Sequence, residues 1–306
     1  MTISEHAEVF YSRPTKLFET ADDWAGPDIA YRICSDYDSG ESTFFERLET
    51  LLAQDRIGDL QALVIGAWQC DDSSRSSKRI VETLVAAKDQ LTRLKALFLG
   101  DIIYEENEIS WIEQSDVSPL LAAFPQLEVL RVRGGNSLSF SKITHKSLRQ
   151  LIVETGGMQR SVLREICRCD FPSLDHLELW LGVDNYGFDG GVEDLQPILT
   201  GTRFPALRYL GLRNSEIVDN IAPVIVNSPV LKQLEVLDLS NGTLSDVGAQ
   251  ALLNLSPSLS LKKLDLSHHY MTNDMVNRLK KTLKCEVLAD GANDPGEEWR
   301  SVVVSE

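Results

Sequence analysis

A short leucine pattern returns eight times along this chain and limits what the chain can fold into. The pattern is Leu-x-x-Leu-x-Leu, with isoleucine or valine at some places, and it is plainest at Leu234–Leu239 and Leu261–Leu266. Self-similarity at spacings of 21 to 34 residues is typical of a protein built from stacked structural units. The first leucines of the eight copies are Leu60, Leu94, Leu127, Leu148, Leu174, Leu207, Leu234 and Leu261.

Each copy predicts a short strand followed by a helix. Alternating leucines bury one face of the strand, and apolar residues at helical spacing, as in Ile80 and Leu84 or in Val247, Ala251 and Leu255, predict a helix over the same core. One unit cannot bury its leucines alone, so the units stack. Strands stack about 4.8 Å apart and helices about 8–10 Å apart, so the stack curves with the strands inside. We therefore expect an α/β, right-handed solenoid, a horseshoe with a parallel inner sheet and outer helices.

These units resemble the leucine-rich-repeat superfamily, and Leu234–Leu255 is most similar to ribonuclease-inhibitor-like repeats. The arrangement with the tail Trp299–Glu306 also resembles uncharacterised bacterial leucine-rich-repeat proteins. The family carries a buried asparagine three residues after the last strand leucine, and this chain does not. Asn214 and Asn241 come one place early, and the expected places hold Trp68, Ile102, Gly135, Gly156, Gly182, Ser215, Gly242 and His269.

The repeats occupy residues 60–284, with a different region at each end. Residues 1–59 read as an irregular lead-in followed by a degenerate capping unit, with a strand over Asp28–Cys34 and a helix over Phe44–Gln54. Residues 285–306 read as a capping strand, Cys285–Asp290, and a tail. We expect Trp299–Val304 to cover the final edge of the sheet, because open strand edges invite pairing with other chains.

Charge and composition exclude several classes of partner. The formal net charge is −16, from 30 basic and 46 acidic residues, so nucleic acid, whose phosphates require a basic surface, is not expected as a partner. No apolar run is long enough for a membrane span and no secretory signal is visible, so we expect a cytoplasmic protein without membrane contact. The five cysteines, Cys34, Cys70, Cys167, Cys169 and Cys285, are expected to be reduced.

The sequence holds no phosphate-binding loop, dinucleotide fingerprint, nucleophile elbow or zinc-protease helix, and we expect no cofactor. Asp184, Asn185 and Asp189 in the insertion Gly182–Gly191 carry oxygen ligands that suit calcium, but they match no complete calcium loop. The adjacent His268 and His269 point to different sides of the chain. We therefore expect no metal site, and interpret Gly182–Gly191 as a loop at the rim.

The residues between the inward leucines face the concave side, and they predict the binding site. We call the concave-facing residues of one strand a row. The first rows in chain order hold small and apolar residues, whereas the middle four rows combine charged and aromatic residues, the composition of protein interfaces. We expect a protein partner, and a scaffold rather than an enzyme. The alternative is an acid/base centre at His176 with Glu178 or Glu154. The predicted partner-binding patch is Arg131, Arg133, Glu154, His176, Glu178, Trp180, Tyr209 and Arg213.

Two readings of this patch stay open at this point. Its charges can simply pair with one another, Arg133 with Glu154 and Glu178 with Arg213. Against that, an indole on the open face of a sheet is unfavourable unless something covers it. We therefore expect Trp180 to be exposed and to anchor the partner, unless the loop Gly182–Gly191 folds over it.

Overall fold

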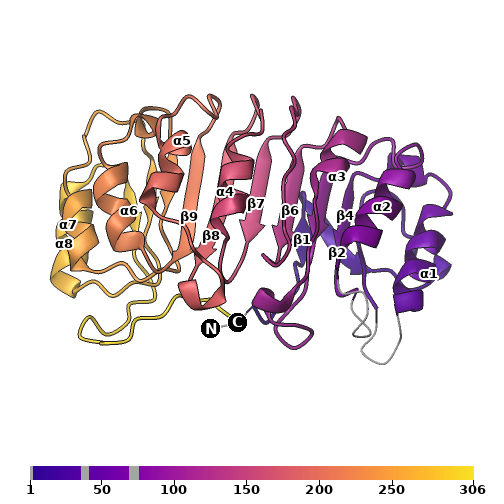
Figure 1. Cartoon of the computed structure of the whole chain (residues 1–306), viewed down its shortest axis with the longest axis horizontal. Helices are drawn as coiled ribbons and strands as arrows, with labels where there is room; N and C mark the ends of the chain where they lie inside the picture. The colour runs from indigo at the N-terminus through magenta and orange to yellow at the C-terminus, as the bar shows by residue number, and fades with distance from the viewer. Residues whose placement is uncertain (1–2, 36–40, 69–75) are drawn as a thin grey trace.

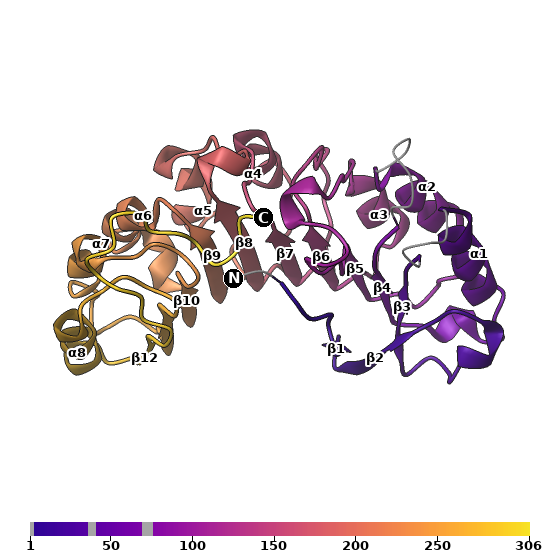
Figure 2. The same ribbon diagram turned by 90° about the horizontal axis from the view of Figure 1, so that it is seen from below.

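The leucine pattern forms one continuous sheet of twelve strands that lie side by side in sequence order. The computed structural model describes residues 3–35, 41–68 and 76–306. Strands β1 and β2 are antiparallel, and every later pair is parallel. Figure 1 shows the strands side by side with the helices packed along them, and Figure 2 shows that the helices cover the convex side while the strands line the concave side. The expected α/β leucine-rich-repeat solenoid is confirmed.

The strands are short and most of the helices span only two or three turns. The strands are β1 Val9–Phe10, β2 Arg13–Leu17, β3 Ala30–Ile33, β4 Ala62–Ile65, β5 Ala96–Leu99, β6 Val129–Arg133, β7 Gln150–Glu154, β8 His176–Gly182, β9 Tyr209–Ser215, β10 Val236–Asp238, β11 Lys263–Asp265 and β12 Glu286–Leu288. The α-helices are α1 Glu41–Leu52, α2 Lys78–Ala86, α3 Ser118–Ala123, α4 Arg160–Ile166, α5 Gln196–Leu199, α6 Val218–Ile225, α7 Asp246–Leu252 and α8 Asn273–Thr282. Short 3-10 helices lie at Ala21–Asp23, Ile57–Asp59, Ile109–Trp111, Asp184–Tyr186, Val192–Leu195 and Pro229–Lys232.

The strand leucines form the core, in the register that the repeat predicts. Leu237 of β10 lies directly opposite Leu264 of β11, and both side chains are fully buried. Helix α7 buries a different set of residues than expected. In α7 the buried residues include Ala249 and Leu252, whereas Val247 is 77% exposed. The prediction that Val247 covers the core is wrong, because its place on the helix is turned toward solvent.

A buried histidine takes the place of the missing asparagine in the last repeat. His269 Nδ1 accepts a hydrogen bond from the Met271 amide at 3.1 Å, and Nε2 lies 3.2 Å from the Ala289 carbonyl. Burial lowers the pKa of this imidazole, so the ring is neutral and bonds backbone groups as an amide side chain would. Asn214 and Asn241 do not occupy the position of the missing asparagine and have another role. Both have positive φ (52° and 65°), a conformation that asparagine tolerates better than most residues.

Both asparagines hold the C-terminal tail, which runs back along the carboxyl ends of the strands (Figure 2). The Asn214 Oδ1 accepts the Val304 amide at 2.9 Å, and its Nδ2 donates to the Val304 carbonyl at 2.5 Å. The Asn241 carbonyl accepts the Val303 amide. The expectation that Trp299–Val304 covers the final sheet edge is therefore wrong, because these residues bond the loops after β9 and β10.

A ladder of alternating charges follows the amino ends of the strands. In the last seven of the eight copies the residue just after the first leucine is charged, and its sign changes from one copy to the next. Lys95 lies 2.8 Å from Glu128, and Lys262 lies 2.6 Å from Glu235. Neighbouring parallel strands place these residues side by side, so each unit meets an opposite charge. The ladder consists of Lys95, Glu128, Arg149, Asp175, Arg208, Glu235 and Lys262.

Candidate functional site

The chain's own N-terminal segment covers the first part of the concave face. Phe10 in β1 packs on Phe98 in β5 with 5.9 Å between ring centroids, in an apolar cluster with Ala62, Val64 and Ala96. Figure 2 shows this segment, residues 3–11, on the inner side of the arc. We call it the N-terminal strap. The small side chains of the early rows leave room for the strap, so those rows are covered rather than open.

The strap also bonds to the rim of the sheet. The Tyr11 hydroxyl donates to Glu128 Oε2 at 2.7 Å, and the Ala7 amide lies 3.3 Å from both carboxylate oxygens of Asp101. The His6 ring lies within 3.6 Å of Asp101 and 3.4 Å of Glu106. These two carboxylates raise the pKa of His6 to about 9. The strap therefore leaves the concave surface open from Arg131 of β6 onward.

Arg131, Arg133 and Glu154 form a buried charge network on strands β6 and β7. Parallel pairing sets Arg133 opposite Glu154, with Nε 2.7 Å from Oε2, and Arg131 Nη2 lies 2.6 Å from Oε1. Burial opposes the charge on Glu154, but the two guanidinium groups hold the pKa of this carboxyl below its usual range. Asp101 joins the network 3.7 Å from Arg133. The expected Arg133–Glu154 pair is present.

His176, Glu178, Tyr209 and Arg213 form a second network, on β8 and β9. The rings of His176 and Tyr209 lie parallel, with centroids 3.8 Å apart. Arg213 Nη1 lies 2.7 Å from Glu178 Oε1, which is the other expected pair. Burial would raise the pKa of Glu178, but His176, Arg213 and the Trp180 indole together lower it to about 2.

Two residues that the sequence reasoning missed complete this second network. Asp238 accepts the Tyr209 hydroxyl at 2.6 Å and lies 3.4 Å from Arg213 Nε. Gly211 makes the close packing possible, because a β-carbon there would lie 3.1 Å from the Tyr209 ring and 3.2 Å from Glu178 Cγ. The repeat alignment could have found Asp238, because it occupies the same place in β10 that Gly211 occupies in β9 and Glu178 in β8.

Trp180 is buried, so the expectation of an exposed indole is wrong. Its side chain is 8% exposed, its Nε1 donates to Glu178 Oε1 at 2.7 Å, and the Arg213 guanidinium lies 5.2 Å from the ring centroid. The loop Gly182–Gly191 makes hydrogen bonds to other parts of the chain: the Asp184 amide donates to Glu216, and the Tyr186 hydroxyl donates to Glu306. Charged neighbours on its own face cover the indole.

The structure thus brings the eight predicted residues to four neighbouring strands and sorts them by exposure. Four of them are buried, namely Arg133, Glu154, Glu178 and Trp180. Four are partly exposed, namely Arg131, His176, Tyr209 and Arg213. In each of the two networks an arginine is the more exposed partner of a buried carboxylate. Arg131 and Arg213 are 26% and 23% exposed, while Glu154 and Glu178 are 1% and 10% exposed.

The geometry disfavours acid/base chemistry at His176. Its Nε2 lies 3.5 Å from Glu178 Oε2, but a carboxylate with a pKa of about 2 accepts a proton poorly near neutral pH. Metal chemistry has no support from the described part of the chain, where no group of three or more histidine, cysteine or acidic side chains is arranged to hold an ion. Cys70 lies outside the described residues, and Cys167, Cys169 and Cys285 are free thiols.

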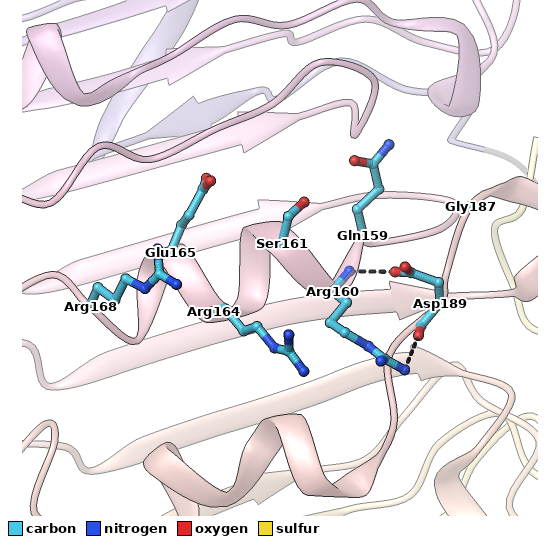
Figure 3. A pocket seen from close by; sticks show the side chains of 8 residues that line it. All are labelled: Gln159, Arg160, Ser161, Arg164, Glu165, Arg168, Gly187 and Asp189. Carbon is cyan, nitrogen blue, oxygen red and sulfur yellow. Dashed lines mark hydrogen bonds between the residues drawn. The ribbon is translucent and has the colours of Figure 1, made fainter.

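A hollow of about 530 Å³ beside α4 is a second candidate site (Figure 3). Three of its lining residues are arginines, spaced one helical turn apart. Arg160 and Arg164 both lie within 3.2 Å of the buried Asp194, and Arg160 also bonds Asp189 twice at 2.6 Å. Glu165 lines the same hollow. Because its charges are balanced internally, the hollow does not form an anion site.

No helix among the described residues has both the length and the apolar character needed to cross a membrane. Comparisons with known proteins found no matching family model and no matching curated protein. Several solved structures are similar to this chain. An internalin from Listeria monocytogenes is 18% identical with a TM-score of 0.37, over 78% of this chain and 56% of its own.

Another similar solved structure is a protein from Bacteroides fragilis, determined as a structural genomics target. It is 31% identical to this chain, with a TM-score of 0.80, and the match covers 90% of this chain and 76% of that one. With this identity over most of both chains, the protein described here belongs to the same family as the Bacteroides fragilis protein.

Proposed function

We propose that this protein is a non-catalytic interaction scaffold that binds a protein partner on the open part of its concave face. Leucine-rich-repeat folds are typically protein-binding scaffolds, and the extended concave surface of a solenoid is the surface such proteins use. The observation that carries the proposal is the division of this face. The N-terminal strap covers the concave residues of β3–β5 and Val129 at the start of β6, while Arg131 and the concave residues of β7–β11 lie beyond it.

The predicted patch divides into contacting and supporting residues under this proposal. Arg131, His176, Tyr209 and Arg213 contact the partner, because they are the partly exposed members. Arg133, Glu154, Glu178 and Trp180 hold them in place through the hydrogen bonds and ion pairs described above. Tyrosine and arginine are also enriched among residues that dominate binding energy.

The partner also meets apolar side chains. Ile152 and Val236 lie on the same face as the patch and are partly exposed. Ile152 sits between Arg131 and Glu178 in the register, and Val236 lies next to Tyr209. A mixed apolar and cationic surface of this kind fits a folded protein or an extended peptide segment.

Three finer assignments accompany the proposal. The chain divides into an N-terminal capping region at 1–59, eight repeats at 60–284 and a C-terminal cap at 285–306. The repeats are of the ribonuclease-inhibitor-like type, because most units pair a strand with an outer helix over 26 to 34 residues. The cytoplasm is the proposed compartment.

The test uses two matched substitutions, one on each side of the solenoid. Val236→Arg places a large cation on the open concave face, and Val247→Arg places the same side chain on the exposed outer face of α7. Partner recovered from native lysate is quantified for each variant, with melting temperature as a control. Val236→Arg should lower partner recovery at least about tenfold, about 1.4 kcal/mol, and Val247→Arg should leave it unchanged. Equal recovery by both variants would contradict binding at this face.

A further inference from the structure

We propose a second interaction surface at the carboxyl rim of the sheet, which binds an arginine- or lysine-rich segment of a partner protein. It is built around Trp111, whose side chain is 57% exposed. The surface, here the acidic aromatic rim, comprises Glu108, Trp111, Asp184, Tyr186, Glu216 and Glu306.

Three separate parts of the chain meet in this rim. Ser110 in the insertion between β5 and α3 donates its hydroxyl hydrogen to the Ser305 carbonyl of the C-terminal tail at 2.6 Å. The Tyr186 hydroxyl in the loop after β8 donates to Glu306 Oε1 at 2.5 Å. Glu306, and more weakly Glu108, raise the pKa of Tyr186, so both carboxylates lie close to this phenol.

Trp111 offers an exposed aromatic side chain to a partner. The indole Nε1 donates to Glu108 Oε2 at 2.9 Å, so the polar atom of the side chain already has a partner. Tryptophan is the best cation–π acceptor among the aromatic side chains, so an exposed indole suits a cationic partner. An adjacent carboxylate then offers a charge-assisted hydrogen bond to the same cation.

The carboxylates of the rim are not neutralised by the protein. Within the described residues, none of Glu108, Asp184, Glu216 and Glu306 lies within 4.0 Å of a cationic side chain, whereas Glu154 and Glu178 on the concave face are both paired. The insertion from Gly100 to Ser118 contains six acidic residues and no lysine or arginine. Burial raises the pKa of Glu216, and the Asp184 carboxylate adds to this rise, although the Asp184 amide donates to Glu216 Oε1 and opposes it.

The charge selects the kind of occupant. An acidic or neutral segment placed over the rim would face unpaired carboxylates, whereas a basic segment would neutralise them and stack a guanidinium or ammonium group on Trp111. The formal net charge of −16 would also steer a basic partner toward the molecule. The rim is separate from the concave face, so this proposal does not depend on the one above.

The test separates specific binding at the acidic aromatic rim from non-specific electrostatic attraction of a basic peptide to an acidic protein. Binding of a fluorescein-labelled peptide of alternating arginine and glycine is measured by anisotropy at about 150 mM salt, with an alternating glutamate and glycine peptide as the comparison. Trp111→Ala should weaken binding of the basic peptide at least about fivefold. Trp299→Ala removes another indole, 82% exposed and next to Arg300, and should not change binding.

A second pair of variants has equal net charge. Glu108→Gln with Glu306→Gln neutralises the rim, and the glutamine oxygen at position 108 can still accept the Trp111 N–H. Glu297→Gln with Glu298→Gln makes the same change in net charge elsewhere on the tail. The first pair should weaken binding about fivefold and the second less than about twofold. Equal losses in both pairs, or similar affinity for the acidic peptide, would overturn the proposal.

Discussion

Replacing Trp180 by alanine should destabilise the fold, and the size of the effect follows from its burial. Truncating a buried tryptophan costs about 3–5 kcal/mol. The side chain is 8% exposed, and its loss also removes the hydrogen bond to Glu178 and the contact with Arg213. An unfolding entropy of about 2.1 cal/mol/K per residue over 306 residues amounts to about 0.6 kcal/mol/K. The melting temperature should therefore fall by about 5–8 °C.

The measurement is calorimetric or circular-dichroism melting of purified protein, with Trp299→Ala as the matched control. That indole is 82% exposed, so its removal should leave the melting temperature within about 1 °C of the parent. If Trp180→Ala melts within about 1 °C of the parent yet loses partner binding, the burial argument is refuted. Trp180 would then act as an exposed anchor.

Three further outcomes can be measured. Burial lowers the pKa of the His269 imidazole, whereas the unfolded chain binds this proton at about pH 6.5, so the parent protein loses stability as the pH falls from about 6.5 to 5. His269→Asn should leave the free energy of unfolding unchanged at about pH 7.5 and reduce that loss, as measured by urea unfolding. An unchanged pH profile would contradict this. Leu264→Ala should cost about 2–5 kcal/mol, since Leu264 is fully buried, and a loss below about 1 kcal/mol would place its strand outside the core. Gel-shift titration at about 150 mM salt should detect no micromolar affinity for nucleic acid, and a retarded band at micromolar protein would argue against the charge reasoning.

The sequence by itself determined the solenoid and the side of the sheet on which each strand residue lies. A strand has a period of two, so leucines at alternate places must share a face, and repetition of the pattern makes each unit cover the next. The same periodicity predicted that Arg133 would lie beside Glu154, and it placed Glu178 and Arg213 on neighbouring strands. The Arg133–Glu154 contact follows directly from register, whereas the Glu178–Arg213 contact is diagonal, because Glu178 lies opposite Gly211 and Arg213 opposite Trp180.

Only the tertiary structure decided which part of the concave face is open and what covers Trp180. The strap joins Ala7 to Asp101 across 94 residues, and the tail joins Asn214 to Val304 across 90. Such contacts come from segments outside the repeat, so no periodicity in the sequence encodes them. Trp180 was misjudged for a related reason. Strand alternation gives the direction of a side chain, but its exposure depends on whether long neighbours such as Arg213 lie over it.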